Sequence, residues 1–314
     1  MKKPFTSLVL AILLLSLLGS GVARSAPGTK TIRDDATGGD CTSMGKWNLA
    51  TKTCMLTMDL TDSIVIADNN ITLDGNGHSI SKGTDPSLGC IQGGGTVKNL
   101  RVTQCSLGIW GPLTVMDSSF TENGLALLAQ GGSNFSFTKN VLSNNAMGIV
   151  LGHVAGALIA NNRILNNQGC GISFKTSANG VNITDNIVSH NDCGISIRGF
   201  NNFVKNNTIS HNRTIGISVV FADLQHIEIY NNNFIGNPSP QVQSSEGAVF
   251  NQDVLIVGNY WSNYHTRPQG CKDLNHDSLC DAPYVFPGGQ DNLPWVHKNG
   301  WLGKDDDNRE EGRN

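Results

Sequence analysis

Residues 140–149 read Asn-Val-Leu-Ser-Asn-Asn-Ala-Met-Gly-Ile, and related stretches follow at 162–172, 186–195 and 207–217. Each stretch begins with an Asn and a short run that resembles a strand, continues with a second Asn, and ends in Gly-Ile. The Gly-Ile steps at 148, 171, 194 and 216 are separated by 23, 23 and 22 residues. Such a fixed period is typical of a repeat architecture, and it decides the fold more firmly than local propensity does.

A period near 22 residues that contains short alternating apolar runs predicts one coil of a parallel β-solenoid. Equivalent residues then stack at about 4.8 Å from coil to coil. The recurring Asn is explained by such stacking, because an inward amide can bond to the amides above and below it and tolerates left-handed backbone. Weaker repeats extend the pattern over residues 67–261, which is space for roughly eight coils of an all-β fold. Leucine-rich repeats would show a Leu framework instead.

The two ends of the chain differ in composition from the repeats. Residues 1–25 combine Lys2 and Lys3, an apolar run and small residues, and predict a secretory signal peptide with no membrane-spanning segment left after cleavage. Residues 29–66 and 262–303 are expected to cap the solenoid, and the polar residues 304–314 to form a disordered tail. A net charge of −3 without a basic cluster argues against nucleic-acid binding. We therefore expect a secreted or periplasmic protein.

The cysteine count fits an oxidising compartment. Eight cysteines follow the signal segment, and their number alone does not fix the connectivity. Sequential pairing gives four short loops, and the third would join two coils because its cysteines are 23 residues apart. The pairs are Cys41 with Cys54, Cys90 with Cys105, Cys170 with Cys193, and Cys271 with Cys280.

Two segments connect the chain to a known group. Residues 71–80 (Ile-Thr-Leu-Asp-Gly-Asn-Gly-His-Ser-Ile) and 258–264 (Gly-Asn-Tyr-Trp-Ser-Asn-Tyr), the latter followed by Asp-Ala-Pro-Tyr at 281–284, resemble the opening and closing motifs of right-handed parallel β-helix proteins of the NosD-like, carbohydrate-binding and sugar-hydrolase type. The resemblance implies a right-handed β-helix over about residues 60–295. It leaves the activity open, because the group includes lyases, hydrolases, epimerases and accessory proteins of periplasmic copper enzymes.

One loop has the spacing of a metal site. Asp273, Asn275, Asp277 and Asp281 place oxygen atoms at positions 1, 3, 5 and 9, which suits a hard cation such as calcium. A metal-free cap clamped by the disulfide of Cys271 and Cys280 is the competing interpretation, and a transition metal bound through His276 is a third.

Several polar residues are candidates for chemistry on the outer surface. Lys175 and Arg198 occupy the same coil position, as do His190 and His211, and Asp185 could neutralise the two cations. Solvated or salt-bridged surface residues are the alternative for all five. The leading hypothesis is a non-catalytic protein that binds a polysaccharide or another envelope component along its outer face. The alternatives are a polysaccharide lyase or related sugar-acting enzyme that uses these residues, and a periplasmic copper-enzyme accessory protein.

Overall fold

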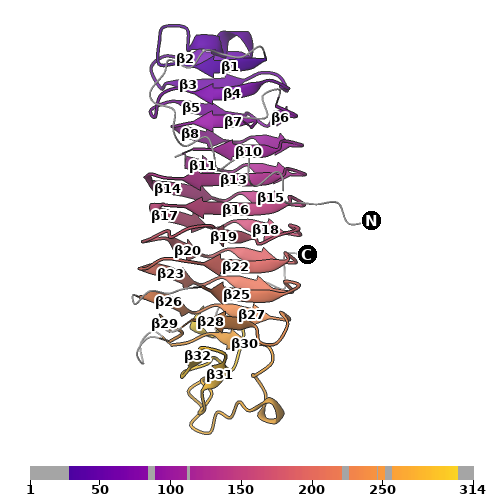
Figure 1. Ribbon diagram of the computed structural model, residues 1–314, viewed down its shortest axis with the longest axis vertical. Helices are drawn as coiled ribbons and strands as arrows, with labels where there is room; N and C mark the ends of the chain where they lie inside the picture. The colour runs from indigo at the N-terminus through magenta and orange to yellow at the C-terminus, as the bar shows by residue number, and fades with distance from the viewer. Residues whose placement is uncertain are drawn as a thin grey trace.

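The computed structural model describes residues 28–83, 89–111, 114–220, 226–245, 247–251 and 257–302. The expected signal peptide and C-terminal tail lie outside these residues. Figure 1 shows the described part as a tall stack of strands. It contains strands and three short 3-10 turns but no α-helix, which confirms the all-β parallel solenoid. No described helix has the length and apolar character needed to cross a membrane.

Three long sheets run the length of the stack. Sheet A contains β1 (Thr29–Ile32), β4 (Ser63–Ile66), β7 (Ile91–Gly93), β10 (Leu107–Trp110), β13 (Leu125–Gln130), β16 (Met147–Gly152), β19 (Ile172–Phe174), β22 (Cys193–Ile197), β25 (Ile215–Val219) and β28 (Val242–Ser244). Sheet B contains β2 (Gly45–Asn48), β3 (Thr53–Leu56), β5 (Thr72–Asp74), β8 (Thr96–Lys98), β11 (Thr114–Met116), β14 (Ser133–Thr138), β17 (Ala155–Ala160), β20 (Asn182–Thr184), β23 (Asn202–Lys205), β26 (Ile227–Tyr230) and β29 (Ala248–Val249). Sheet C contains β6 (Ser79–Ser81), β9 (Arg101–Thr103), β12 (Ser119–Thr121), β15 (Val141–Ser143), β18 (Arg163–Leu165), β21 (Ile187–Ser189), β24 (Thr208–Ser210), β27 (Asn233–Ile235) and β30 (Tyr260–Trp261).

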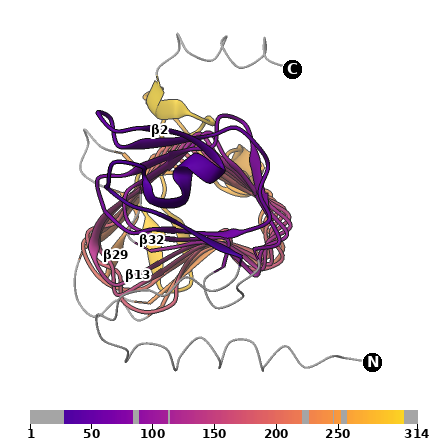
Figure 2. The ribbon, with the colours of Figure 1, turned by 90° about the horizontal axis from the view of Figure 1, so that it is seen from above.

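Each coil contributes one strand to each sheet in the order A, B, C. Strands β4 to β27 form eight complete coils and β28 to β30 a ninth, close to the roughly eight that the repeat predicts. The predicted Gly-Ile register is confirmed, since Ile149 pairs with Ile172, Ile172 with Ile195 and Ile195 with Ile217. Seen from above in Figure 2, the coils superimpose, so a residue at one coil position lies above its equivalent in the next coil.

The interior combines aliphatic side chains with two ladders of buried asparagines. Asn186 shows the pattern: its Oδ1 accepts from the backbone N–H of Asn162, while its Nδ2 donates to the Oδ1 of Asn207 and to the carbonyl of Ile159, all at 2.8–2.9 Å. The predicted ladders are therefore present. One contains Asn140, Asn162, Asn186, Asn207, Asn232 and Asn259, and the other contains Asn123, Asn145, Asn167, Asn191, Asn212 and Asn237.

The first ladder ends on a buried carboxylate. Asp291, the last residue of β32 (Gly289–Asp291), accepts from the backbone N–H of Asn259 at 2.6 Å and from the indole of Trp261 at 2.9 Å. β32 pairs with β31 (Tyr284–Phe286), whose Tyr284 stacks on Trp261 with ring centroids 4.3 Å apart. This hairpin lies under the last coil and covers its apolar interior, which an open solenoid end would expose to water.

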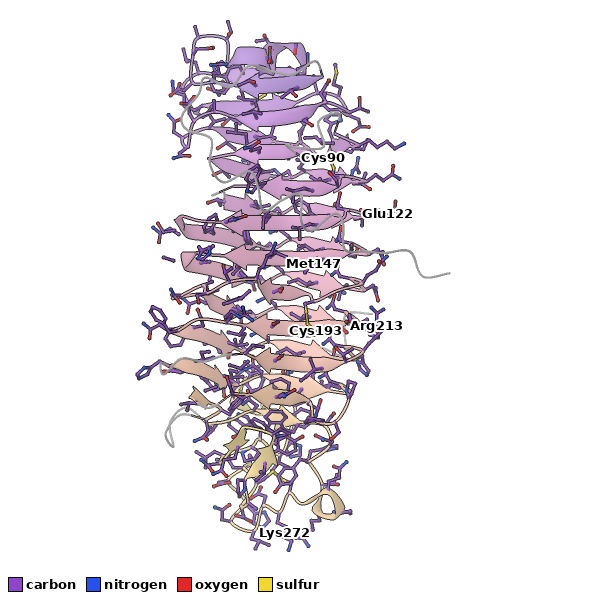
Figure 3. All side chains as sticks on the ribbon, viewed as in Figure 1. Cys90, Glu122, Met147, Cys193, Arg213 and Lys272 are labelled. Atoms are coloured by element: carbon purple, nitrogen blue, oxygen red, sulfur yellow. A yellow bond between two sulfur atoms is a disulfide. The ribbon has the colours of Figure 1, made fainter. Side chains whose placement is uncertain are left out.

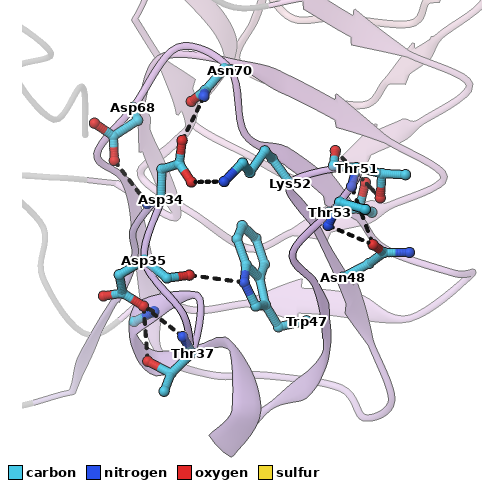
Figure 4. Close-up of polar contacts among 12 residues, drawn as sticks. Asp34, Asp35, Thr37, Trp47, Asn48, Thr51, Lys52, Thr53, Asp68 and Asn70 are labelled. Atoms are coloured by element: carbon cyan, nitrogen blue, oxygen red, sulfur yellow. Dashed lines mark hydrogen bonds and ion pairs between the residues drawn. The ribbon is translucent and has the colours of Figure 1, made fainter.

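The opposite end is closed by local elements of a different kind. β2 pairs antiparallel with β3, and the 3-10 turn η2 (Gly39–Ser43) precedes them. Figure 4 shows the polar contacts beside this hairpin, where Lys52 and Asn70 both bind the carboxylate of Asp34. The hydrogen bond from Lys52, followed by that from Asn70, holds the pKa of Asp34 below its usual value. Residues 29–66 also supply β1 and β4, which are parallel members of sheet A.

The four disulfides join the cysteines in the predicted sequential pairs. Figure 3 labels Cys90 and Cys193, one member of each of the two disulfides that link successive coils of the solenoid. The other two pairs, Cys41–Cys54 and Cys271–Cys280, lie in the segments before and after the regular repeats.

Candidate functional site

The predicted catalytic residues are distributed over three corners of the coil. Lys175 and Arg198 follow β19 and β22, between sheets A and B, whereas Asp185 follows β20, between sheets B and C. His190 and His211 follow β21 and β24, between sheets C and A. The structure therefore brings these residues together only in two coil-to-coil pairs. It does not place Asp185 with the two cations, and the Asp185 carboxylate instead accepts from the Thr184 hydroxyl at 2.7 Å.

The two histidines form the clearest of these pairs. Their rings stack with centroids 5.2 Å apart and planes within 17° of parallel. Nδ1 of His190 shares a hydrogen bond of 2.6 Å with Ser189, which accepts from Ser210 at 3.0 Å. Both rings are exposed, so the arrangement is a polar stack on a corner rather than an enclosed base.

A neighbouring ion pair completes this corner. Asp192 and Arg213 are 3.6 Å apart, and Arg213 also donates to the carbonyl of Gln168 at 3.0 Å. Both partners are substantially exposed, and a pair of this kind adds little to stability. It links two coils in the same way as the histidine stack.

The Asp-rich loop is held by its own hydrogen bonds. Asp273 accepts from the backbone N–H groups of Asp277 and Ser278 at 3.2 Å, and Asp277 accepts from that of Leu279 at 2.9 Å. Asp281 accepts from the N–H of Leu274 at 2.8 Å. The oxygens predicted to bind calcium thus support the loop backbone, and calcium binding stays a prediction.

A shallow groove that combines charged and neutral polar groups lies at the corner between sheets B and C. Its volume is about 600 Å³, and it is lined by Asn76, Gly77, Asn99, Leu100, Arg101, Asp117, Ser118, Ser119, Lys139 and Val141. None of these residues is among the site residues predicted from the sequence.

The repeat geometry explains why this corner is hollow. In seven successive coils one residue at this corner adopts left-handed backbone, with φ between 49° and 58°; this corner column contains Asn99, Asp117, Lys139, Asn161, Asp185, Asn206 and Asn231. The next residue points inward at the position of the first Asn ladder, and the one after it begins the outer column of sheet C. That column contains Ser79, Arg101, Ser119, Val141, Arg163, Ile187, Thr208 and Asn233. The inward residue, which lies between the corner column and the outer column of sheet C, forms the floor of the groove.

The groove carries more positive than negative charge. Arg101 and Lys139 line it, Arg163 follows one coil beyond Val141, and all three are exposed. Within the described part of the chain no side-chain hydrogen bond or ion pair engages any of the three. Asp117 is the carboxylate among the lining residues. An anionic ligand could therefore bind cations that no side chain of the described residues engages.

The carboxylate next to the groove is already neutralised. Asp74 lies 3.3 Å from Lys98 and accepts from the Asn99 amide at 3.1 Å. Burial acts to raise the pKa of Asp74, but the hydrogen bonds from the Asn76 backbone, Asn99 and Lys98 outweigh it and lower the pKa. This carboxylate consequently stays ionised and paired, and it orients Asn99 at the groove wall.

The register of the internal repeats indicates part of this site. Arg101 and Arg163 each directly follow a ladder position, Leu100 and Asn162, so the repeat register places both in one outer column. Lys139 directly precedes the ladder residue Asn140 and therefore belongs to the adjacent corner column. What the repeat could not indicate is that these two columns face each other across a hollow.

The fold and this surface define a disulfide-linked parallel β-helix with a polar, cation-bearing groove outside its stacked core. The family model described as "Periplasmic copper-binding protein (NosD)" matches residues 62–266. The chain belongs to this family. Its four disulfides fit the oxidising periplasm that the family description names. No curated protein matches the chain.

Three solved structures are similar to the chain at low identity. A complex of XylC with xylose is 13% identical with a TM-score of 0.41, and covers 57% of this chain and 38% of that protein. The A-module of a mannuronan C-5 epimerase from Azotobacter vinelandii is 20% identical with a TM-score of 0.41, and covers 62% and 57%. A mutant of the periplasmic alginate epimerase AlgG is 14% identical with a TM-score of 0.38, and covers 62% and 64%. The chain thus spans less than two thirds of the length of each.

The family description raises the question of a copper site. Copper is held by thiolate, thioether or imidazole groups. All cysteines of the chain form disulfides, and His190 and His211 lie face to face rather than converging on one point. Among the described residues no three His, Cys, Asp or Glu side chains gather as metal ligands. The residues in this part of the chain therefore do not fit a copper site.

Proposed function

We propose that this protein binds an acidic polysaccharide of the cell envelope along the groove between sheets B and C, without altering it chemically. The observation that carries the proposal is the groove itself, where Arg101 and Lys139 reach solvent and no described side chain engages them. Carboxylate-bearing sugars offer the matching charge. Ser119, Asn76 and Asn99 supply neutral hydrogen-bonding groups at the same wall for sugar hydroxyls.

The repeat spacing supports a linear polymer as the ligand. The groove-lining residues come from successive coils about 4.8 Å apart, so charged and neutral side chains that can contact a ligand follow one another along a line parallel to the solenoid axis. A polymer with regularly spaced carboxylates can engage several coils at once, and weak contacts then add through multivalency. Each exposed contact alone is worth only about 0–1 kcal/mol.

Binding of polygalacturonate and of a neutral glucan, measured by affinity electrophoresis and calorimetry, tests the proposal. Arg101→Ala combined with Lys139→Ala should weaken binding of polygalacturonate at least tenfold at low salt. Lys46→Ala, which removes an exposed cation from the N-terminal hairpin, is the matched control and should bind like the wild type. Equal binding by the groove variant and the wild type, or preference for the neutral glucan, would contradict the proposal.

The lyase hypothesis makes a different prediction for the same material. A lyase needs a base and charge-neutralising cations around one sugar, whereas Lys175, Asp185 and His190 stand at three different corners. Incubation with polygalacturonate should leave the polymer length unchanged and produce no ultraviolet absorbance from unsaturated uronates. Growth of that absorbance would replace the binding proposal by the lyase.

A further inference from the structure

The C-terminal segment runs onto the surface that carries the groove. Asn299 and Asn233 exchange two hydrogen bonds, of 2.6 Å and 3.0 Å, and the Trp295 indole donates to Asn231 at 3.3 Å. Asn233 belongs to the outer column of sheet C that also contains Arg101 and Arg163, but it is only 1% exposed because this segment covers it. Figure 2 shows the final 3-10 turn η4 (Gly300–Leu302), in yellow, outside the stacked coils.

The residues that follow Leu302 are acidic. Residues 303–314 carry five acidic side chains (305–307, 310 and 311) and three basic ones (304, 309 and 313), so their net charge is −2. They lie outside the described residues. Their negative charge is opposite to that of the groove, and they continue from a segment that lies on the same surface.

Residues 303–314 are long enough to reach the three cations of the groove, Arg101, Lys139 and Arg163. From the coil of Asn233, Arg163 is three coils away and Arg101 six, or about 14 Å and 29 Å at about 4.8 Å per coil. Twelve extended residues span up to about 40 Å. Residues 305–307 are within reach of Arg163, and residues 310 and 311 are within reach of Lys139 and Arg101.

We propose that residues 303–314 bind in the cationic groove as a tethered competitor of the acidic polysaccharide, an inference that rests on the proposed function of the groove. Charge complementarity and tether length carry it. A tether of this length gives an effective concentration of the order of millimolar, so even weak ion pairs occupy the groove for part of the time. Polysaccharide binding then displaces the tail, and salt weakens both contacts.

Truncation after Leu302 tests the competition. We expect the truncated protein to bind polygalacturonate about two- to tenfold more tightly than the full chain at low salt, with the difference lost near 1 M salt. The full chain carrying Asp305→Asn, Asp306→Asn and Asp307→Asn should have an affinity for polygalacturonate between those of the full and truncated proteins. Neutralising Lys304→Gln and Arg309→Gln instead is the matched control and should not raise the affinity. Equal affinity of full and truncated chains at low salt overturns the inference.

Cross-linking reads the contact without any polysaccharide. A carbodiimide should join the Lys139 amine to a carboxylate of residues 305–311, detected as a linked peptide by mass spectrometry, and Lys139→Arg should abolish that product while keeping the charge. If neither form of the protein binds polygalacturonate, the proposed function fails and the cross-link alone decides the inference. Absence of the linked peptide overturns it in that case.

Discussion

Consecutive residues at the corner between sheets B and C follow opposite rules. The inward members Asn140, Asn162 and Asn186 are identical and buried, whereas the residues just before them, Lys139, Asn161 and Asp185, are exposed and differ in charge. An inward amide must match the amides above and below it, because an unpaired buried polar group costs about 1–3 kcal/mol. An outward residue needs only to tolerate left-handed backbone. Stability therefore restricts one column, and the other column is free to determine what binds.

The largest expected effect breaks the inner column. Asn186→Leu would leave the backbone N–H of Asn162 without its acceptor and would remove the hydrogen bonds of the Asn186 amide to the Asn162 and Asn207 side chains and to the Ile159 carbonyl, at a cost of about 2–5 kcal/mol in the free energy of unfolding. Asn182→Leu is the matched control, since it is exposed on the same coil and follows Leu158 in its column. Its cost should stay within about 0.5 kcal/mol in chemical denaturation. Similar midpoints for the two variants would refute the ladder as a source of stability.

The end of the same ladder should respond to pH. Burial raises the pKa of Asp291 from its usual 3.8 to about 6, although hydrogen bonds from Trp261, Asn259 and Leu293 act to lower it. The folded chain therefore holds this proton more tightly than the unfolded chain. The contribution of Asp291 to stability is complete below pH 4 and is lost as pH rises through 6.

Asp291→Asn isolates this contribution from that of other carboxylates. The free energy of unfolding of the wild type relative to the variant should fall by about 1.4 kcal/mol per pH unit between about pH 4 and about pH 6, and should stay constant at higher pH. Denaturant titrations of both proteins at several pH values measure the difference. A difference that does not change with pH would show that Asp291 titrates normally.

The third prediction is that the Asp-rich loop binds calcium in addition to making its own hydrogen bonds. Calcium at tenfold excess over a millimolar-range dissociation constant should stabilise the protein by about 1.4 kcal/mol and raise its melting temperature. Asp277→Ala should abolish the increase, and Asp185→Ala, a corner aspartate in the solenoid, should preserve it. A melting temperature that responds to reductant but not to calcium or chelator would leave the disulfide of Cys271 and Cys280 as the support of the loop.

The smallest effect concerns the corner column. Asp117 lines the groove beside Arg101 and Lys139 and would repel a polyanion. Asp117→Asn keeps the shape and the left-handed backbone, so polygalacturonate should bind about two- to threefold more tightly while the unfolding midpoint hardly changes. Weaker binding would show that Asp117 makes a favourable contact with the ligand.

The repeat predicted the fold in detail because every coil solves the same packing problem. The Gly-Ile register, the Asn ladders and the disulfide between Cys170 and Cys193 all follow from one period of 22 or 23 residues. The candidate site did not follow in the same way. Lys175, Asp185 and His190 lie close in the sequence, but each follows a strand of a different sheet.

The sequence by itself determined the coil, its register and its buried amides, since these depend on contacts between residues at equivalent positions of neighbouring repeats. Only the tertiary structure decided which side chains share a corner. Residues such as Arg101 and Lys139 belong to different positions of the repeat, and their separation depends on how sharply the chain turns between sheets B and C. The same holds for Asn299, which lies 66 residues from Asn233 and reaches sheet C only because the chain doubles back over the last coils.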